Sequence, residues 1–141
     1  MYRYDEVMTY CQEEDVKFIR LAFCDLAGNQ KNIAIMPTEL GRAFEYGISF
    51  DASAIQGFGD ETKSDLFLFP DPSTLSVLPW RPTQGRVVRM FCEIQNPDGT
   101  PFQRDSRFLL KKAIARLLLW GGIRILSVPN RRKWIPHKGA L

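Results

Sequence analysis

Apolar and polar residues alternate most regularly in residues 86–95, RVVRMFCEIQ. Because side chains two positions apart share a face of a strand, this segment predicts a strand with one apolar face. That face consists of Val88, Met90, Cys92 and Ile94. Residues 16–24, VKFIRLAFC, are rich in branched and aromatic side chains and predict another strand. Further strands are predicted at 31–36, 66–69 and 74–78, and the turn signal Ala27-Gly28-Asn29 joins 16–24 to 31–36 as a hairpin.

Apolar residues recur at helical spacing in residues 4–14 and again towards the C-terminal end. Asp105 or Ser106 is predicted to cap the last helix. The apolar stripe of that helix consists of Leu110, Ala113, Ile114 and Leu117. A short helix is predicted at 37–46, because proline suits a first turn, with Gly47 as a left-handed end. A hairpin, a short helix, further strands and a final helix predict an α+β domain whose mixed sheet is packed by helices.

A carboxylate stands at the start of a loop in the segment FDASAIQGFGDETKSDLFLFPDP, residues 50–72. Asp51 follows an apolar approach and precedes small residues, and Ser64-Asp65 leads into the strand predicted at 66–69. Rigid flanks of this kind are typical of loops that carry chemistry, so Asp51 is a candidate for presenting one charge outward. The same pattern also fits an aspartate that only caps its loop by accepting bonds from nearby backbone amides.

Residues 50–72 resemble the N-terminal signature of glutamine synthetases, in which Phe-Asp-Gly-Ser-Ser precedes a loop and then Ser-Asp before an apolar strand. The resemblance continues through Pro79-Trp80 and through NPDGTPF at 96–102, and it covers roughly residues 15–120. It implies the β-grasp domain at the front of type I, bacterial-like members of this family. On this basis residues 1–120 are predicted to form that domain, and 121–141 an irregular basic tail. For Trp80 we expect packing in the core or at an interface.

The resemblance also implies roles for individual residues. Asp51 takes the place of the family's loop aspartate, which helps bind ammonium and remove its proton, and Ser53 takes the place of the first serine. A carboxylate stabilises a nearby cation and can accept a proton. Ala52 replaces the motif's glycine, which argues against a required positive φ, and Ala54 replaces its second serine. Asp60 stands where some members carry an arginine in this loop.

The family's large C-terminal barrel domain holds ATP, glutamate and Mg²⁺ or Mn²⁺, and the N-terminal domain of the neighbouring subunit closes each site. No Asp or Glu follows Asp105 in this chain, although magnesium needs oxygen ligands. We therefore expect this chain to bind no metal or ATP by itself and to lack ligase activity in isolation. Its expected partners are the catalytic barrel domain and neighbouring subunits, in a homo-oligomer that is a dodecamer in the family. The alternative is a stand-alone β-grasp module for protein interaction, without catalysis.

Charge is distributed unevenly along the chain, whose formal net charge is +3. Five of the 19 basic residues and none of the 16 acidic ones lie in 121–141, including the run Arg131-Arg132-Lys133. We expect this tail to be poorly ordered past Pro129 and not to be native family sequence, as after a truncated or shifted reading frame. Nucleic-acid binding through the tail has little support, since Trp134 is its single aromatic residue. No nucleic-acid or membrane partner is predicted.

The remaining chemistry-bearing residues give no further motif. The three cysteines are far apart, so a disulfide framework or zinc site is not expected. Cys24 and Cys92 lie in predicted strands and are expected to be buried, inert thiols. The single histidine, His137, lies in the basic tail without a surrounding pattern. The N-terminus has no apolar signal core and no segment approaches the ~20 residues of a membrane span, so a cytoplasmic protein is predicted.

Overall fold

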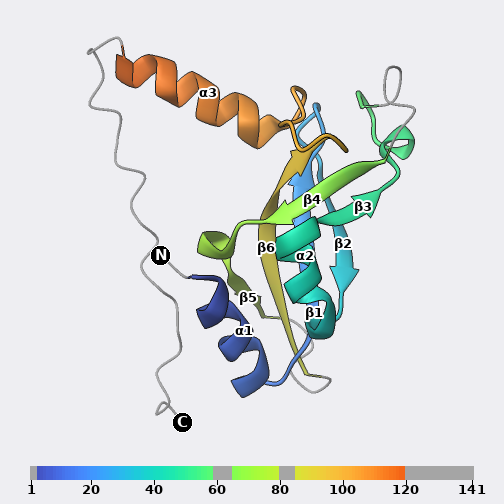
Figure 1. The fold of residues 1–141 in the computed structure, drawn as a ribbon, viewed down its shortest axis with the longest axis vertical. Coiled ribbons are helices and arrows are strands. Elements are labelled where there is room, and N and C mark those ends of the chain that lie inside the picture. Colours follow the sequence, from blue (N-terminus) through green and yellow to red (C-terminus); the bar gives the residue numbers. More distant parts are fainter. Residues whose placement is uncertain (1–2, 59–64, 80–84, 120–141) are drawn as a thin grey trace.

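The computed structural model describes residues 3–58, 65–79 and 85–119. Within these ranges a mixed sheet runs in the order β2-β1-β6-β4-β3, and β5 pairs with β6 off that path (Figure 1). The strands are β1 Val16–Cys24, β2 Gln30–Ile35, β3 Ile48–Phe50, β4 Leu66–Pro70, β5 Ser76–Leu78 and β6 Arg86–Gln95. The helices are α1 Tyr4–Glu13, α2 Leu40–Tyr46 and α3 Ser106–Leu119, with short 3₁₀ turns at Pro37–Glu39, Ala52–Ala54 and Pro72–Thr74. This arrangement confirms the predicted α+β class and the β-grasp-like sheet.

The two halves of the sheet meet on β6, which pairs with β1 on one side and with β4 on the other. β1 forms an antiparallel hairpin with β2 and lies parallel to β6. On the other side of β6, β4 pairs antiparallel with it and β3 pairs antiparallel with β4. The hairpin turn follows the predicted sequence: Gly28 has φ +83°, and the buried carboxylate of Asp25 accepts bonds from the backbone and side-chain nitrogens of Asn29. Glycine adopts this φ without steric cost.

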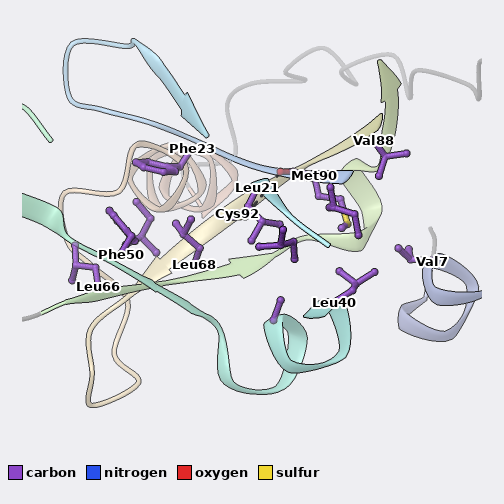
Figure 2. Close-up of a cluster of buried hydrophobic side chains, with 14 of the residues drawn as sticks. Val7, Leu21, Phe23, Leu40, Phe50, Leu66, Leu68, Val88, Met90 and Cys92 are labelled. Atoms are coloured by element: carbon purple, nitrogen blue, oxygen red, sulfur yellow. Dashed lines mark hydrogen bonds between the residues drawn. The ribbon is translucent and has the colours of Figure 1, made fainter. Parts of the chain in front are cut away.

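The core lies between one face of this sheet and the helices α1 and α2 (Figure 2). The alternating face predicted on β6 is fully buried, and β1 contributes the neighbouring apolar positions. The helices add Val7 from α1 and Leu40 and Ala43 from α2. The main buried positions on the two strands are Ile19, Leu21, Phe23, Val88, Met90, Cys92 and Ile94. The pattern of apolar residues therefore predicted the inner face of the sheet correctly.

Three local predictions differ from the structure. Gly47 does end α2 with positive φ, but its ψ of 172° is extended rather than left-handed helical. Glycine is needed there for space as well, because a Cβ would lie 2.9 Å from the ring of Phe69. The strand predicted at 74–78 is shorter, because Asp71 accepts a bond from the Ser73 backbone and caps the turn Pro72–Thr74. Cys24 is only half-buried, since it ends β1 on the face opposite the core, whereas Cys92 is buried as expected.

Helix α3 begins where the sequence predicts, but its apolar stripe is not covered by the described residues. Asp105 caps it through a 3.0 Å bond from the Arg107 backbone N–H. The helix then projects away from the sheet (Figure 1). Leu110 and Ile114 of the predicted stripe are 61% and 40% exposed. The expectation that helices pack the sheet holds for α1 and α2 and not for the body of α3.

Several predictions fall on residues outside the described ranges: Asp60, Trp80 and the whole of the predicted basic tail, 121–141. Among the helices of the described ranges, none combines the length and apolar character that crossing a membrane requires.

Candidate functional site: the Asp51 loop

Asp51 leaves the sheet at the end of an edge strand. β3 pairs with β4 in the register Ile48↔Leu68 to Phe50↔Leu66, which is the last pair of this ladder. Asp51 directly follows Phe50 and Asp65 directly precedes Leu66, so both residues lie next to this last pair. Two carboxyl residues therefore flank the mouth of the loop, each fixed by the strand next to it. The sheet supplies the rigid flank that the sequence predicted.

The carboxylate of Asp51 is exposed and oriented by its own loop. Its Oδ1 accepts a 2.8 Å hydrogen bond from the backbone N–H of Ser53 and so caps the short 3₁₀ turn Ala52–Ala54. The side-chain hydroxyl of Ser53, and then its backbone N–H, hold the pKa of Asp51 below its usual range because both stabilise the charged form. Asp51 is thus ionised at neutral pH and faces solvent together with Ser53.

Buried side chains anchor the loop on both sides of these exposed residues. Ala52 is 1% exposed and its methyl group belongs to the core, which explains how alanine serves where the related motif has glycine. Its backbone lies in a 3₁₀ turn and has no positive φ. Phe58 anchors the loop further along the chain, fully buried, with its ring edge-on to Phe102 at a centroid distance of 4.9 Å. Buried aromatic pairs in this geometry hold their segments firmly.

Polar and backbone contacts also hold the loop at Gly57. Gly57 has φ +87°, and a Cβ there would lie 2.7 Å from Leu26 in the β1–β2 turn. Its carbonyl oxygen accepts a 2.9 Å bond from the guanidinium of Arg104. The loop is therefore attached to the hairpin turn and to the segment before α3, and Asp51 is presented on a fixed support.

The structure brings the two predicted site residues together, and their roles stay predictions. The arrangement suits binding of a cation and acceptance of a proton, because an exposed carboxylate with a lowered pKa stays charged. In the described part of the chain, no three His, Cys, Asp or Glu side chains lie close enough together to hold a metal ion.

Sequence reasoning missed a buried polar arrangement beside β6. Asp71 forms a 2.6 Å ion pair with Arg107, which joins the turn after β4 to α3. Asp105, nearly fully buried, also accepts a bond from the backbone N–H of Ile94, and burial raises the pKa of its carboxyl group. The only sequence signal was an acidic residue ahead of a helical pattern, which predicts a cap but not the strand it joins.

Comparison with known proteins agrees with the fold. The family described as "Glutamine synthetase, beta-Grasp domain" matches residues 15–97, and the chain belongs to this family. Glutamine synthetase of Mycolicibacterium smegmatis is 46% identical over 112 residues, and that of Methanosarcina mazei is 47% identical over 110. Each match covers 78% of this chain and 25% of the relative. The chain thus spans about a quarter of the length of these relatives.

Solved structures show the same fold. The Plasmodium falciparum glutamine synthetase structure aligns with a TM-score of 0.75 at 24% identity, covering 86% of this chain and 23% of that one. A structure titled "GmaS/ADP complex-Conformation 1" aligns with a TM-score of 0.71 at 25% identity, covering 80% of this chain and 25% of its own. The resemblance seen in the sequence is confirmed, and with it the β-grasp domain.

Proposed function

We propose that this chain acts as the N-terminal domain of a glutamine synthetase, an ATP-dependent ligase that joins ammonia to glutamate. In this proposal its loop completes an ammonium site whose other residues belong to a neighbouring subunit. The observation that carries the proposal is the exposed, ionised carboxylate of Asp51 on an anchored loop. Asp51 would bind ammonium and accept the proton that leaves before nitrogen attacks, and Ser53 would hold Asp51 in position.

ATP and Mg²⁺ or Mn²⁺ belong, in this proposal, to the catalytic barrel domain. They neutralise charge on the phosphates and on the activated glutamate when bound there. The 141-residue chain alone is proposed to be inactive as a ligase. A coupled ATP-hydrolysis assay with glutamate and ammonium checks this, and turnover above a no-protein blank would contradict it. The division at residue 120, with an atypical tail beyond it, stays a proposal as well.

The exposed side of α3 supports a role within a larger assembly. Leu110, Ile114 and Leu117, which share one face of the helix, are 61%, 40% and 36% exposed. Clustered exposed apolar side chains mark surfaces that meet another protein. We propose that this side contacts the barrel domain or a neighbouring subunit in a homo-oligomer of the kind the family forms, in a cytoplasmic enzyme.

The role of Asp51 is tested in a chimaera in which residues 15–120, the span of the resemblance, replace the matching segment of the Mycolicibacterium smegmatis relative. Asp51→Asn keeps the shape and the cap but removes the charge. It should lower kcat/KM for ammonium by about 10²-fold or more, the scale of a lost proton acceptor, and leave KM for ATP nearly unchanged. Asp98→Asn is the matched control, because exposed Asp98 accepts a 2.9 Å bond from the Thr100 backbone N–H in the same local geometry. Equal effects of the two substitutions would contradict the proposal.

The exposed apolar side of α3 also fits a second candidate function, a stand-alone interaction module. Size-exclusion chromatography with and without the full-length relative separates the two. Incorporation of the chain into the relative's oligomer supports the synthetase domain. A stable monomer that does not co-elute with the relative's oligomer favours the stand-alone interaction module.

A further inference from the structure

Two arginines lie side by side on the face of the sheet that turns away from the core. β1 and β6 are parallel neighbours, and their register pairs Arg20 directly with Arg89. Both side chains must point outward, because the adjacent positions Ile19 and Met90 are fully buried on the inner face. Like charges directly opposite each other on neighbouring strands are unfavourable, so this pair calls for an explanation.

A cavity of about 160 Å³ opens between these arginines and the β2 and β5 strands on either side. It is lined by Arg20, Gln30, Asn32, Leu78 and Arg89. The lining contains two positive charges, two amides and one apolar side chain, and no carboxylate. The cavity belongs to the β2-β1-β6 side of the sheet, whereas Asp51 follows β3 at the opposite edge. It is therefore separate from the Asp51 loop.

Neither guanidinium is neutralised within the described residues. Arg20 donates a 2.7 Å hydrogen bond to Oδ1 of Asn32, a neutral acceptor. Arg89 lies over the ring of Phe91 at 4.8 Å, and its buried Nε has no hydrogen-bond partner among the residues that the structure describes. A buried donor without a partner is unfavourable, and native structures seldom leave one without a reason.

The nearby acidic groups are already engaged. Asp71 pairs with Arg107, and Glu93, which lies on the same face of β6 as Arg89, pairs with Lys111. Neither carboxylate is free to serve the two arginines. The two arginines in the cavity therefore have no carboxylate partner among the described residues of this part of the sheet.

We propose that this cavity is a binding site for a small oxyanion, an organic diacid or a phosphate-bearing metabolite. A guanidinium presents two parallel N–H donors that match a carboxylate or phosphate, and two of them suit a doubly charged ligand. Asn32 accepts from Arg20 through its oxygen, so its NH₂ group and that of Gln30 can donate to the ligand. Leu78 supplies an apolar wall for a short carbon chain. Its volume lies below the ~300 Å³ of typical drug-sized pockets, which favours a small ligand over a whole nucleotide.

The test uses the 141-residue chain, labelled with ¹⁵N, titrated with sodium succinate and, separately, with sodium phosphate at constant ionic strength. We expect saturable shifts of the side-chain amide signals of Asn32 and Gln30. Succinate binding without phosphate binding identifies an organic diacid, and the reverse identifies a phosphate-bearing ligand. Absence of saturation by both anions up to about 10 mM overturns the proposal, since paired arginine contacts imply binding tighter than that.

Variants decide whether the two arginines hold the anion. Arg20→Gln and Arg89→Gln should each weaken binding at least tenfold. Arg20→Lys keeps the charge but loses the planar fork, and it should weaken binding several-fold. Arg42→Gln, an exposed position on α2, is the matched loss of one positive charge and should leave binding unchanged. The dispersion of the same spectra reports whether each variant is folded. Equal weakening by Arg42→Gln and Arg20→Gln would show a diffuse charge effect and overturn the proposal.

Discussion

Phe58 is the residue whose removal tests how the Asp51 loop is held. Its ring is fully buried and meets Phe102 edge-on at 4.9 Å, so Phe58→Ala removes a buried aromatic side chain and one half of this pair. The loop between the end of β3 and Phe58 then keeps Ala52 as its main buried anchor. We expect loss of stability together with loosening of the loop.

The magnitude follows from burial. Replacing a fully buried phenylalanine by alanine lowers the free energy of unfolding by about 3–5 kcal/mol, through lost transfer free energy and the cavity left behind. The aromatic pair accounts for about 0.5–1.5 kcal/mol of this. Phe58→Leu keeps most of the volume and should lower the free energy of unfolding by less than about 1.5 kcal/mol. The free energy of unfolding of a domain is about 5–15 kcal/mol, so Phe58→Ala should be marginally stable and Phe58→Leu should stay folded.

Urea unfolding followed by far-ultraviolet circular dichroism measures both variants. With a urea slope of about 2 kcal/mol per molar, Phe58→Ala should lower the midpoint by about 2 M. Leu110→Ala, at a position 61% exposed, is the control and should change stability by no more than about 0.5 kcal/mol. Hydrogen exchange at the Ser53 amide, which bonds to Asp51, should become faster in Phe58→Leu. If Phe58→Ala matched Leu110→Ala, the loop would not be anchored as described.

Three further predictions test other parts of the fold. Burial raises the pKa of the Asp105 carboxyl group above its unfolded value of about 3.9. The contribution of Asp105 to stability is therefore most favourable below that pH and is lost as the pH rises through the folded pKa. Asp105→Asn should gain stability relative to the natural chain between about pH 4 and neutrality, and parallel pH profiles of the two proteins would contradict this. Gly57→Ala should lower the free energy of unfolding more than Gly28→Ala, because both have positive φ but only Gly57 lies close to another side chain; equal losses of about 1 kcal/mol would show that φ alone matters. An aromatic disulfide reagent should modify half-exposed Cys24 in the native protein, and it should modify Cys92, whose thiol pKa is raised by burial, only after unfolding. Mass spectrometry of the labelled peptides measures the order of modification, and the reverse order would contradict this prediction.

Local sequence patterns predicted those elements whose cause is local. The alternation in β6 predicted which of its side chains are buried, since a strand with one covered face repeats every two residues. The Gly28 turn and the Asp105 cap also followed from nearby residues. The candidate site was found through Asp51 and Ser53, which lie two residues apart and meet through a bond within one turn.

Other features could not be predicted because they depend on distant parts of the chain. The apolar stripe of α3 indicated a helix, but the spacing of leucines does not say which surface covers them, and the described residues leave Leu110 and Ile114 exposed. The support of the Asp51 loop required Phe102 and Arg104 to approach from the segment before α3. The periodicity of apolar residues indicates which side of a helix or strand is apolar, but it does not indicate which other element packs against that side.

The sequence by itself determined most of the helices and strands, although not β3, and the inner face of the sheet, because each follows from residues close together along the chain. It also indicated the family and the position of Asp51, through several motifs in the right order. Only the tertiary structure decided that Arg20 lies beside Arg89, since this requires β1 and β6 to pair in parallel and in one register. It also decided that Asp51 stands at an exposed edge while Ala52 and Phe58 reach the core. The physical reason is that packing and strand pairing join positions remote in sequence, and the charge or burial of a side chain is fixed only by those contacts.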